Sequence, residues 1–369
     1  MDEQILVIGA GISGCTLARK IAEAGKKVVI VDIRTHIGGN CYDYFDKDGN
    51  YVKPYGPHIF HTKHEEVYNF LSRFTSWNSY KHKVYAEVDD KLYIIPFNVG
   101  SIRQAFDDIT AKRIVSRLEY FYGKDENVSI LKLMQKKDDY YISLLSEFVY
   151  RKIFLNYTLK QWDIRPENIS PEVIDRVPVY IGKEEQYFKD DRYQGMPKYG
   201  FTSMFNNMIN HENIKLILNE DYKNLQLFHY RKIFVTSPID EFFDYKYGKL
   251  KYRRLRIELE TINKPSYQYN SVINFPQDKS ITRISEFNKF LRIKNNSTVI
   301  GREYPTWDKD GFLAYPVLDK KNLDILEKYK KDIEILKNVY FVGRLAEYKY
   351  LNMDQVVKNA LSVAEGIQW

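Results

Sequence analysis

A glycine-rich turn between a strand and a helix constrains this chain more than any other feature. Gln4-Ile-Leu-Val-Ile8 is an apolar run typical of a strand, and Gly9-Ala-Gly11-Ile-Ser13-Gly14 follows it directly. Residues 15–24 favour a helix, and a second strand over 27–31 ends on Asp32. A G-x-G-x-x-G turn in this context is the signature of a dinucleotide-binding domain. The helix N-terminus offers N–H groups to a pyrophosphate, and Asp32 can accept hydrogen bonds from a ribose.

A second pair of glycines indicates which dinucleotide binds. Arg34 is followed by Gly38, Gly39 and Asn40 just after the ribose-binding acid. This segment resembles the FAD-binding extension of the glutathione-reductase and amine-oxidase type flavoproteins. The two glycines let the chain pass close to the cofactor, and Asn40 adds a donor and an acceptor. The sequence therefore favours FAD over NAD.

The bulk composition is that of a globular enzyme. With 369 residues, 44% of them hydrophobic and 28% charged, the chain can bury a core in two or three domains. The net charge of +7 is scattered, and no nucleic-acid-binding motif accompanies it, which favours an anionic small ligand over a nucleic acid. The densest basic stretch fits one face of a strand: Lys249, Lys251, Arg253, Arg254 and Arg256.

The two cysteines, Cys15 and Cys41, stand in no metal-ligand spacing, so the sequence predicts no metal site and a reducing compartment. Residues 4–8 run straight into the glycine turn and leave no room for a signal peptide. No run approaches the roughly 18 apolar residues of a membrane span. We expect a cytoplasmic protein.

The pattern along the chain predicts an α/β fold with two insertions. A Rossmann-like FAD-binding domain is expected to be assembled from both chain ends, because residues 339–344 repeat the strand-glycine pattern and a helix follows at 353–367. We expect this domain to comprise residues 1–80, 190–240 and 305–369, a helical-bundle domain residues 98–185, and an antiparallel sheet domain residues 81–97 and 241–304. Within these, the pattern predicts a helix over 63–74, a hairpin over 84–95, a loop-like segment over 156–187 and strands at 214–217 and 232–235.

Several longer strings carry a more specific resemblance. They run along nearly the whole chain: Gly9 to Gly14, His36-Ile-Gly-Gly-Asn40, Tyr55-Gly-Pro-His58-Ile-Phe-His61-Thr62, Tyr157-Thr-Leu-Lys-Gln-Trp162, Gln194-Gly-Met-Pro197, Thr282-Arg-Ile284 and Phe341-Val-Gly-Arg344. The combination resembles the UDP-galactopyranose mutase family, in its bacterial form.

The resemblance implies an isomerase that interconverts UDP-galactopyranose and UDP-galactofuranose, the sugar used in surface glycans. In that family the N5 of reduced FAD attacks the anomeric carbon and UDP leaves, so the cofactor carries the chemistry and the protein positions it. The resemblance also implies a homodimer. The residues leave open whether an N-acetylated sugar is accepted, and they do not name the reductant.

The resemblance also implies roles for individual residues. Arg176 and Arg283 match the arginines that bind the diphosphate, which suits the bidentate geometry of guanidinium groups. The expected uridine pocket contains Phe154, Tyr157, Thr158 and Asn274, and Trp162 matches the tryptophan of a mobile loop. Tyrosines expected around the phosphates are Tyr187, Tyr315 and Tyr350. The flavin is expected to contact His58, His61, Arg344, Met353 and Asp354, in addition to Gly9, Gly11, Ser13, Gly14, Asp32, Arg34, Gly38, Gly39 and Asn40.

Three positions depart from the family pattern. Ile153 stands where an aromatic is frequent, Asn352 stands where an acid is frequent, and Lys349 replaces an arginine. Two other functions remain as alternatives. A redox flavoenzyme explains residues 1–40 equally well but not the two arginines, and a non-catalytic sensor of a sugar nucleotide would not need Trp162.

Overall fold

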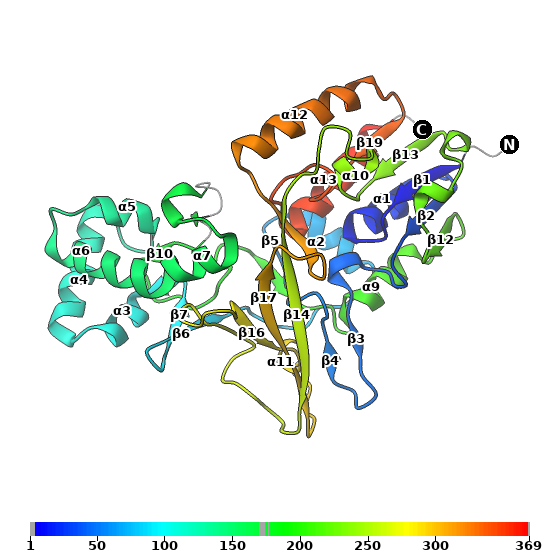
Figure 1. The fold of residues 1–369 in the computed structure, drawn as a ribbon. Helices are drawn as coiled ribbons and strands as arrows, with labels where there is room; N and C mark the ends of the chain where they lie inside the picture. Colours follow the sequence, from blue (N-terminus) through cyan, green and yellow to red (C-terminus); the bar gives the residue numbers. More distant parts are fainter. Residues whose placement is uncertain (1–3, 170–173, 176, 368–369) are drawn as a thin grey trace.

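The computed structural model describes residues 4–169, 174–175 and 177–367, which form three parts (Figure 1). The first part contains a five-stranded parallel sheet in the order β12-β2-β1-β13-β19. Its strands come from the N-terminal, middle and C-terminal parts of the chain, and the α/β dinucleotide-binding fold expected from the sequence is confirmed. The strands are β1 (Ile5–Ile8), β2 (Val28–Asp32), β12 (Ile214–Leu218), β13 (Lys232–Val235) and β19 (Val339–Phe341).

The two central strands are buried because helices cover both faces of the sheet. β1 and β2 are runs of Val, Ile and Leu, as parallel strands buried on both sides require. α1 (Ile12–Glu23) packs against α9 (Gly200–Ile209) and α13 (Met353–Gly366). The other helices of this part are α2 (Glu65–Ser72), α10 (Ile239–Phe242) and α12 (Lys320–Ile335), with short turns η1 (Gly39–Cys41), η4 (Tyr222–Asn224) and η5 (Leu227–His229).

The second part is a seven-stranded sheet in the order β18-β14-β17-β16-β15-β6-β7. All neighbours are antiparallel except β15 and β6. β18 pairs with β14, so this sheet continues past residue 304, where the sequence placed its end. Its strands are β6 (Val84–Val88), β7 (Lys91–Ile95), β14 (Tyr252–Ile262), β15 (Val272–Asn274), β16 (Arg283–Glu286), β17 (Thr298–Thr306) and β18 (Phe312–Pro316), with the short α11 (Asn288–Leu291).

The third part is helical and lies at the left of Figure 1. The segment expected to be loop-like from residue 156 begins with a helix, because 156–162 continues the preceding helical turns. The elements are α3 (Val99–Ala105), α4 (Asp108–Tyr122), α5 (Ile130–Gln135), α6 (Tyr140–Val149), a π-helical turn η2 (Tyr150–Leu155), α7 (Asn156–Trp162) and η3 (Pro166–Asn168), with a small sheet of β8 (Phe97–Asn98), β9 (Asn127–Val128) and β10 (Val179–Tyr180).

Two short pairs complete the fold. β5 (Phe60–Thr62) pairs with β11 (Tyr193–Gly195), and β3 (Tyr44–Phe45) pairs with β4 (Tyr51–Val52). The β5–β11 pair joins the histidine-containing segment to the segment that precedes α9.

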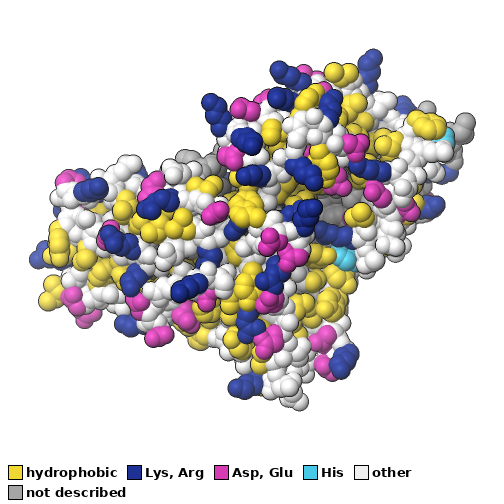
Figure 2. Space-filling view, in the orientation of Figure 1, with side chains coloured by type: hydrophobic (Ala, Val, Ile, Leu, Met, Phe, Trp, Pro, Cys, Tyr) yellow, Lys and Arg dark blue, Asp and Glu magenta, His cyan; other side chains and the backbone are white. Residues whose placement is uncertain are grey.

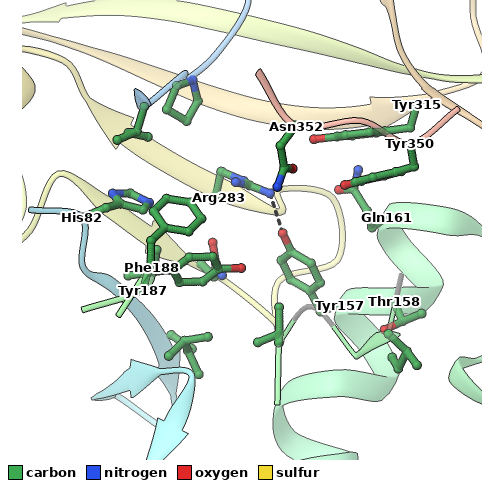
Figure 3. Close-up of a pocket in the computed structure, with 18 of the residues that line it drawn as sticks. His82, Tyr157, Thr158, Gln161, Tyr187, Phe188, Arg283, Tyr315, Tyr350 and Asn352 are labelled. Carbon is green, nitrogen blue, oxygen red and sulfur yellow. Dashed lines mark hydrogen bonds between the residues drawn. The ribbon is translucent and has the colours of Figure 1, made fainter. Parts of the chain in front are cut away.

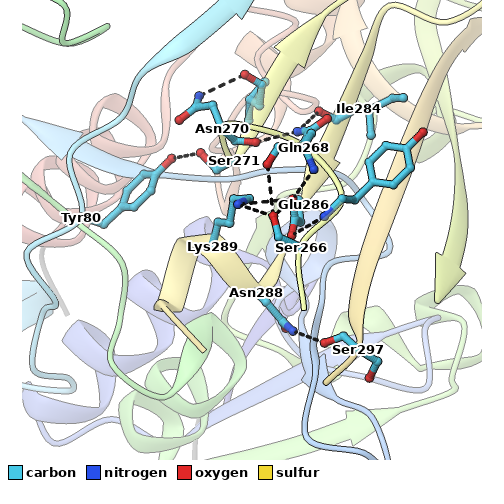
Figure 4. A network of polar contacts seen from close by, with 12 residues as sticks. Tyr80, Ser266, Gln268, Asn270, Ser271, Ile284, Glu286, Asn288, Lys289 and Ser297 are labelled. Atoms are coloured by element: carbon cyan, nitrogen blue, oxygen red, sulfur yellow. Dashed lines mark hydrogen bonds and ion pairs between the residues drawn. The ribbon is translucent and has the colours of Figure 1, made fainter. Parts of the chain in front are cut away.

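A buried polar network stiffens the sheet beside the site (Figure 4). Glu286 is 1% exposed and accepts hydrogen bonds from the backbone N–H groups of Tyr267 and Gln268. Its charge is compensated by Lys289 at 3.6 Å. These hydrogen bonds and the ammonium offset the desolvation cost of the buried carboxylate, which ends the strand that begins at Arg283.

On the face shown in Figure 2, basic and acidic side chains are interspersed, and neither kind dominates the surface. Within the described residues, no helix carries an apolar stretch long enough to cross a lipid bilayer.

Candidate active site

A cavity of about 590 Å³ is lined by residues of all three parts (Figure 3). It brings together most of the predicted substrate residues and four of the predicted flavin residues. Those that line it are His58, His61, Phe154, Tyr157, Thr158, Trp162, Tyr187, Asn274, Arg283, Tyr315, Arg344, Tyr350 and Met353.

Arg283 supplies a fixed positive charge to this cavity. It begins β16, and its Nη2 donates to the hydroxyl of Tyr157 at 2.7 Å. Its Nε lies 3.0 Å from Oε1 of Glu303 on the neighbouring strand, and Glu303 is 3% exposed. Burial acts to lower the pKa of Arg283, but the Glu303 carboxylate together with Tyr157, Tyr315 and Tyr187 outweighs it, and the pKa is raised well above its usual value. The guanidinium is therefore permanently charged and suited to an anion.

One face of a continuous helical run forms the second wall. Phe154, Tyr157, Thr158 and Gln161 follow the spacing i, i+3, i+4, i+7, which places all four side chains on the same side of η2 and α7. All four line the cavity. The Oε1 of Gln161 and the Oδ1 of Asn274 are buried without a hydrogen-bond partner in the described part of the chain. The site therefore offers two acceptors to a ligand with N–H or O–H donors.

Stacked aromatic rings form a third wall. Tyr315 and Tyr350 are parallel, with centroids 5.1 Å apart, and Trp162 leans on them at 5.4 and 6.0 Å. The guanidinium of Arg344 lies 5.5 and 5.6 Å from the two tyrosine rings. Arg344 is itself held by the carbonyl oxygens of Leu351 and Ala314. This wall combines ring faces with a cation, as expected for a site that takes both a sugar and a phosphate.

Histidines occupy the opposite side of the cavity. The Nδ1 of His61 lies 2.5 Å from Oδ2 of Asp191, and its ring stacks on Phe188 at 3.5 Å. Asp191 fixes Nδ1 as the donor, which leaves Nε2 for the cavity. His58 donates from Nδ1 to the carbonyl of Gly56 at 3.2 Å, and burial, with Lys53 and Arg344, lowers its pKa to about 3. Neutral His58 thus presents an acceptor.

The burial of His82 makes the free energy of unfolding depend on pH. It is 5% exposed and bonded to Tyr80, and burial, reinforced by His61 and Arg283, lowers its pKa from 6.5 to about 3. Between these values the unfolded chain binds a proton that the folded chain does not. We therefore expect His82 alone to lower the free energy of unfolding by about 1.4 kcal/mol per pH unit as the pH drops from about 6 to about 4, with an equal contribution from His58, whose pKa is lowered to the same value.

Urea titrations across this pH range measure the slope. H82Q removes the contribution of His82 and should reduce the slope by about 1.4 kcal/mol per pH unit, whereas H229Q, at an exposed position, should leave it unchanged. A slope identical in H82Q and the unaltered chain would contradict the assignment.

The dinucleotide side of the structure fits an anionic group. Gly11 precedes α1 and has no side chain to cap it, so the first N–H groups of the helix are free of side-chain partners. The Nη1 of Arg34 is buried beside Gly39 with no hydrogen-bond partner among the described residues. A pyrophosphate would satisfy both, because each offers donors to oxygen.

The acid of the second strand is already oriented. Asp32 accepts from the backbone N–H of Ala10 at 2.7 Å through Oδ2, and from that of Arg34 at 2.9 Å through Oδ1. Each carboxylate oxygen keeps a lone pair for a ribose hydroxyl. Asn40 links Arg34 to the carbonyl of Leu313, at 2.9 Å on each side. This set of acceptors and donors therefore suits the ribose and pyrophosphate of a dinucleotide.

Other residues predicted to bind the cofactor allow tight turns or join neighbouring elements. Gly9 and Gly38 have φ of +104° and +97°, which favours glycine at both positions. Ser13 donates to the carbonyl of Val342 at 3.1 Å and so ties α1 to the C-terminal strand. Asp354 accepts from Thr62 at 3.0 Å at the start of α13.

The structure also shows the surroundings of the three residues that depart from the family pattern. Asn352 is the N-cap of α13 and forms a capping box with Gln355, a role that needs an oxygen acceptor but no charge. Lys349 pairs with Glu347 at 3.0 Å, is largely exposed and does not line the cavity. Ile153 lines the cavity beside Ile169, Ile174 and Val177, so this wall is aliphatic. The predicted phosphate residue Arg176 lies outside the described residues.

Sequence reasoning missed four polar or aromatic residues of the site: Gln161, Phe188, Asp191 and Glu303. Gln161 stood inside a string already noted, and its helical spacing from Tyr157 could have identified it. Asp191 gave no such signal because it lies 130 residues from its partner His61.

The fold and the site define an enzyme with a dinucleotide-binding domain and a separate cavity for an anionic ligand. The model of the UDP-galactopyranose mutase family matches residues 152–350, and that of an NAD(P)-binding Rossmann-like domain matches residues 7–74.

Full-length relatives agree with these matches. The chain is 33% identical to dTDP-fucopyranose mutase of Escherichia coli, with 98% of this chain and 97% of the relative covered. It is also 33% identical to a probable UDP-galactopyranose mutase of Klebsiella pneumoniae, with 99% and 94% covered. A crystal structure of reduced UDP-galactopyranose mutase superposes with a TM-score of 0.72 at 14% identity, covering 98% of this chain and 95% of that one. The chain belongs to the UDP-galactopyranose mutase family and is a flavin-dependent isomerase.

Proposed function

We propose that this chain interconverts UDP-galactopyranose and UDP-galactofuranose and so supplies galactofuranose for surface glycans. The observation that carries the proposal is the partly buried Arg283, bonded to Tyr157 in a cavity walled by Tyr315 and Tyr350. A charge held by Glu303 and a tyrosine hydroxyl suits a leaving group that departs with about two negative charges. Arg176, outside the described residues, is proposed as a second phosphate ligand.

FAD is the proposed cofactor, held by the glycine turn, Asp32, Arg34 and the segment around Arg344. When bound and reduced it supplies a nucleophile, N5, for the anomeric carbon of the sugar. The chain's own residues bind and orient the sugar nucleotide: Arg283 neutralises the diphosphate, and the buried oxygens of Gln161 and Asn274, which have no partner among the described residues, accept from ligand N–H or O–H groups. We further propose that the active form is a cytoplasmic homodimer.

Incubation with UDP-galactofuranose, with and without dithionite, tests the proposal. We expect UDP-galactopyranose to form only under reduction, with no stoichiometric use of the reductant. A redox flavoenzyme would consume reductant in proportion to product, and a sensor would bind the nucleotide without converting it. Because the E. coli relative is named for dTDP-fucopyranose, a parallel incubation with that compound ranks the two substrates by kcat/KM.

Trp162 is expected to matter for turnover and not for cofactor binding. It contacts Tyr315 and Tyr350 and lines the cavity, and no residue of the glycine turn is among the described residues that line it. W162A should lower kcat by about 100-fold, because closure over the substrate excludes water and fixes its position. Flavin absorbance per chain should stay close to that of the unaltered protein.

W162F is the matched variant, since it keeps an aromatic ring against the tyrosine stack. Its kcat should fall less than that of W162A. Equal turnover in W162A and the unaltered enzyme would refute a role for this side chain.

A further inference from the structure

Helix α7 ends against the seven-stranded sheet. A buried arginine of this sheet donates hydrogen bonds to the last carbonyl groups of the helix. Arg253 on β14 donates from Nε to the carbonyl of Gln161 and from Nη2 to that of Lys160, both at 2.7 Å. Arg253 is 4% exposed, and its guanidinium lies 4.4 Å from the ring of Trp307. The last carbonyl groups of a helix have no partner within it, and a cation there also complements the helix dipole.

Lys160 connects α7 to the same sheet a second time, but here a side chain of the helix donates to the backbone of the sheet. Its ammonium donates to the carbonyl oxygens of Phe275, Asp278 and Ile281 at 2.7, 2.6 and 2.6 Å. All three belong to the turn that joins β15 to β16. An ammonium has three N–H donors, so this one is saturated.

The turn itself is well ordered. Oδ1 of Asp278 accepts from the backbone N–H groups of Ser280 and Ile281, both at 2.7 Å. The turn begins after Asn274 and ends at Arg283, which are both cavity residues. Lys160 therefore joins the helix that carries Tyr157 and Trp162 to the strands that carry Asn274 and Arg283.

Neither cation lines the cavity, so both must act through other side chains. We propose that Lys160 and Arg253 are positioning residues that hold α7 at the spacing required for the Tyr157–Arg283 hydrogen bond and for the placement of Trp162. This inference rests on the proposed function for its kinetic consequence, but the held position of α7 can be measured without it. It also assigns a role to one member of the basic stretch 249–256, which composition alone left unexplained.

The kinetic test uses K160M, which removes the donors and keeps a long apolar stem. We expect kcat/KM to fall by about 100-fold, as displacement of a positioning element by about 1 Å can cause. Flavin content should not change, because Lys160 is distant in sequence from the glycine turn and donates its hydrogen bonds to the turn between β15 and β16. K160R restores a cation with several donors and should recover most of the activity.

K152M is the matched control, since Lys152 precedes Lys160 on the same helical run and pairs with Asp89 at the surface. It should leave kcat/KM unchanged. A K160M enzyme with kcat/KM within about twofold of the unaltered enzyme, after correction for bound flavin, would show that these contacts serve stability alone.

Hydrogen exchange separates this inference from the proposed function. In the full chain without substrate, K160M and R253M should each speed exchange of the amides of 157–162, and K152M should not. If the unaltered chain converts no sugar nucleotide yet K160M speeds this exchange, the proposed function fails and the positioning role stands. Unchanged exchange at 157–162 in both K160M and R253M would overturn the positioning role even in an active mutase.

Discussion

R283M is expected to lower kcat/KM for UDP-galactofuranose by about 100- to 1,000-fold. Arg283 is a charged donor in the cavity, and loss of one preorganised donor to developing negative charge has effects of this size. The same change leaves Glu303 buried without its ion-pair partner, which costs about 3 to 5 kcal/mol of stability. Steady-state kinetics on flavin-loaded enzyme, together with urea unfolding, measure the two effects separately.

A second substitution distinguishes lost chemistry from lost folding. R283M/E303Q removes the uncompensated carboxylate, so stability should recover while activity should not. R302M is the matched control, because Arg302 lies on the adjacent β17, pairs with the exposed Glu260 and does not line the cavity. If R283M/E303Q regained activity along with stability, the role of Arg283 as a phosphate ligand would be refuted.

Local signals made the dinucleotide part predictable from sequence. The glycine turn needs only a strand, a helix N-terminus and an acid within the first 32 residues, and each of these is visible in a short window. The parallel sheet followed from runs of Val and Ile bounded by polar residues. The return of the chain in β19 and α13 was also expected, because residues 339–344 repeat a strand followed by glycine.

The residues that form the walls of the site are brought together by strand pairings between segments that are distant in sequence. No short stretch of the sequence reveals these pairings. Arg253 belonged to a basic stretch expected on one face of a strand, yet Arg253 is buried and bonded to α7 while Arg256 pairs with Glu258 at the surface. Asp191 meets His61 only because β11 pairs with β5. Likewise, the edge position of β18 depends on its pairing with β14 and is invisible in its own five residues.

G14A is expected to produce a chain that binds little flavin. A Cβ at Gly14 would lie 1.9 Å from the carbonyl oxygen of Gly9, a backbone atom that cannot rotate away. Either α1 or the end of β1 must shift, and both carry the N–H groups that face the pyrophosphate. We expect flavin absorbance per chain to fall by at least about tenfold and the free energy of unfolding to fall by about 1 to 3 kcal/mol.

Gly366 provides the matched control for this substitution. It lies in the last turn of α13, and a Cβ there would meet no atom within 4 Å. G366A should therefore bind flavin normally and gain up to about 1 kcal/mol from the higher helix propensity of alanine. Purification of G14A with a full complement of flavin would contradict this prediction. It would show that flavin binding does not require the close packing of Gly14 against the end of the first strand.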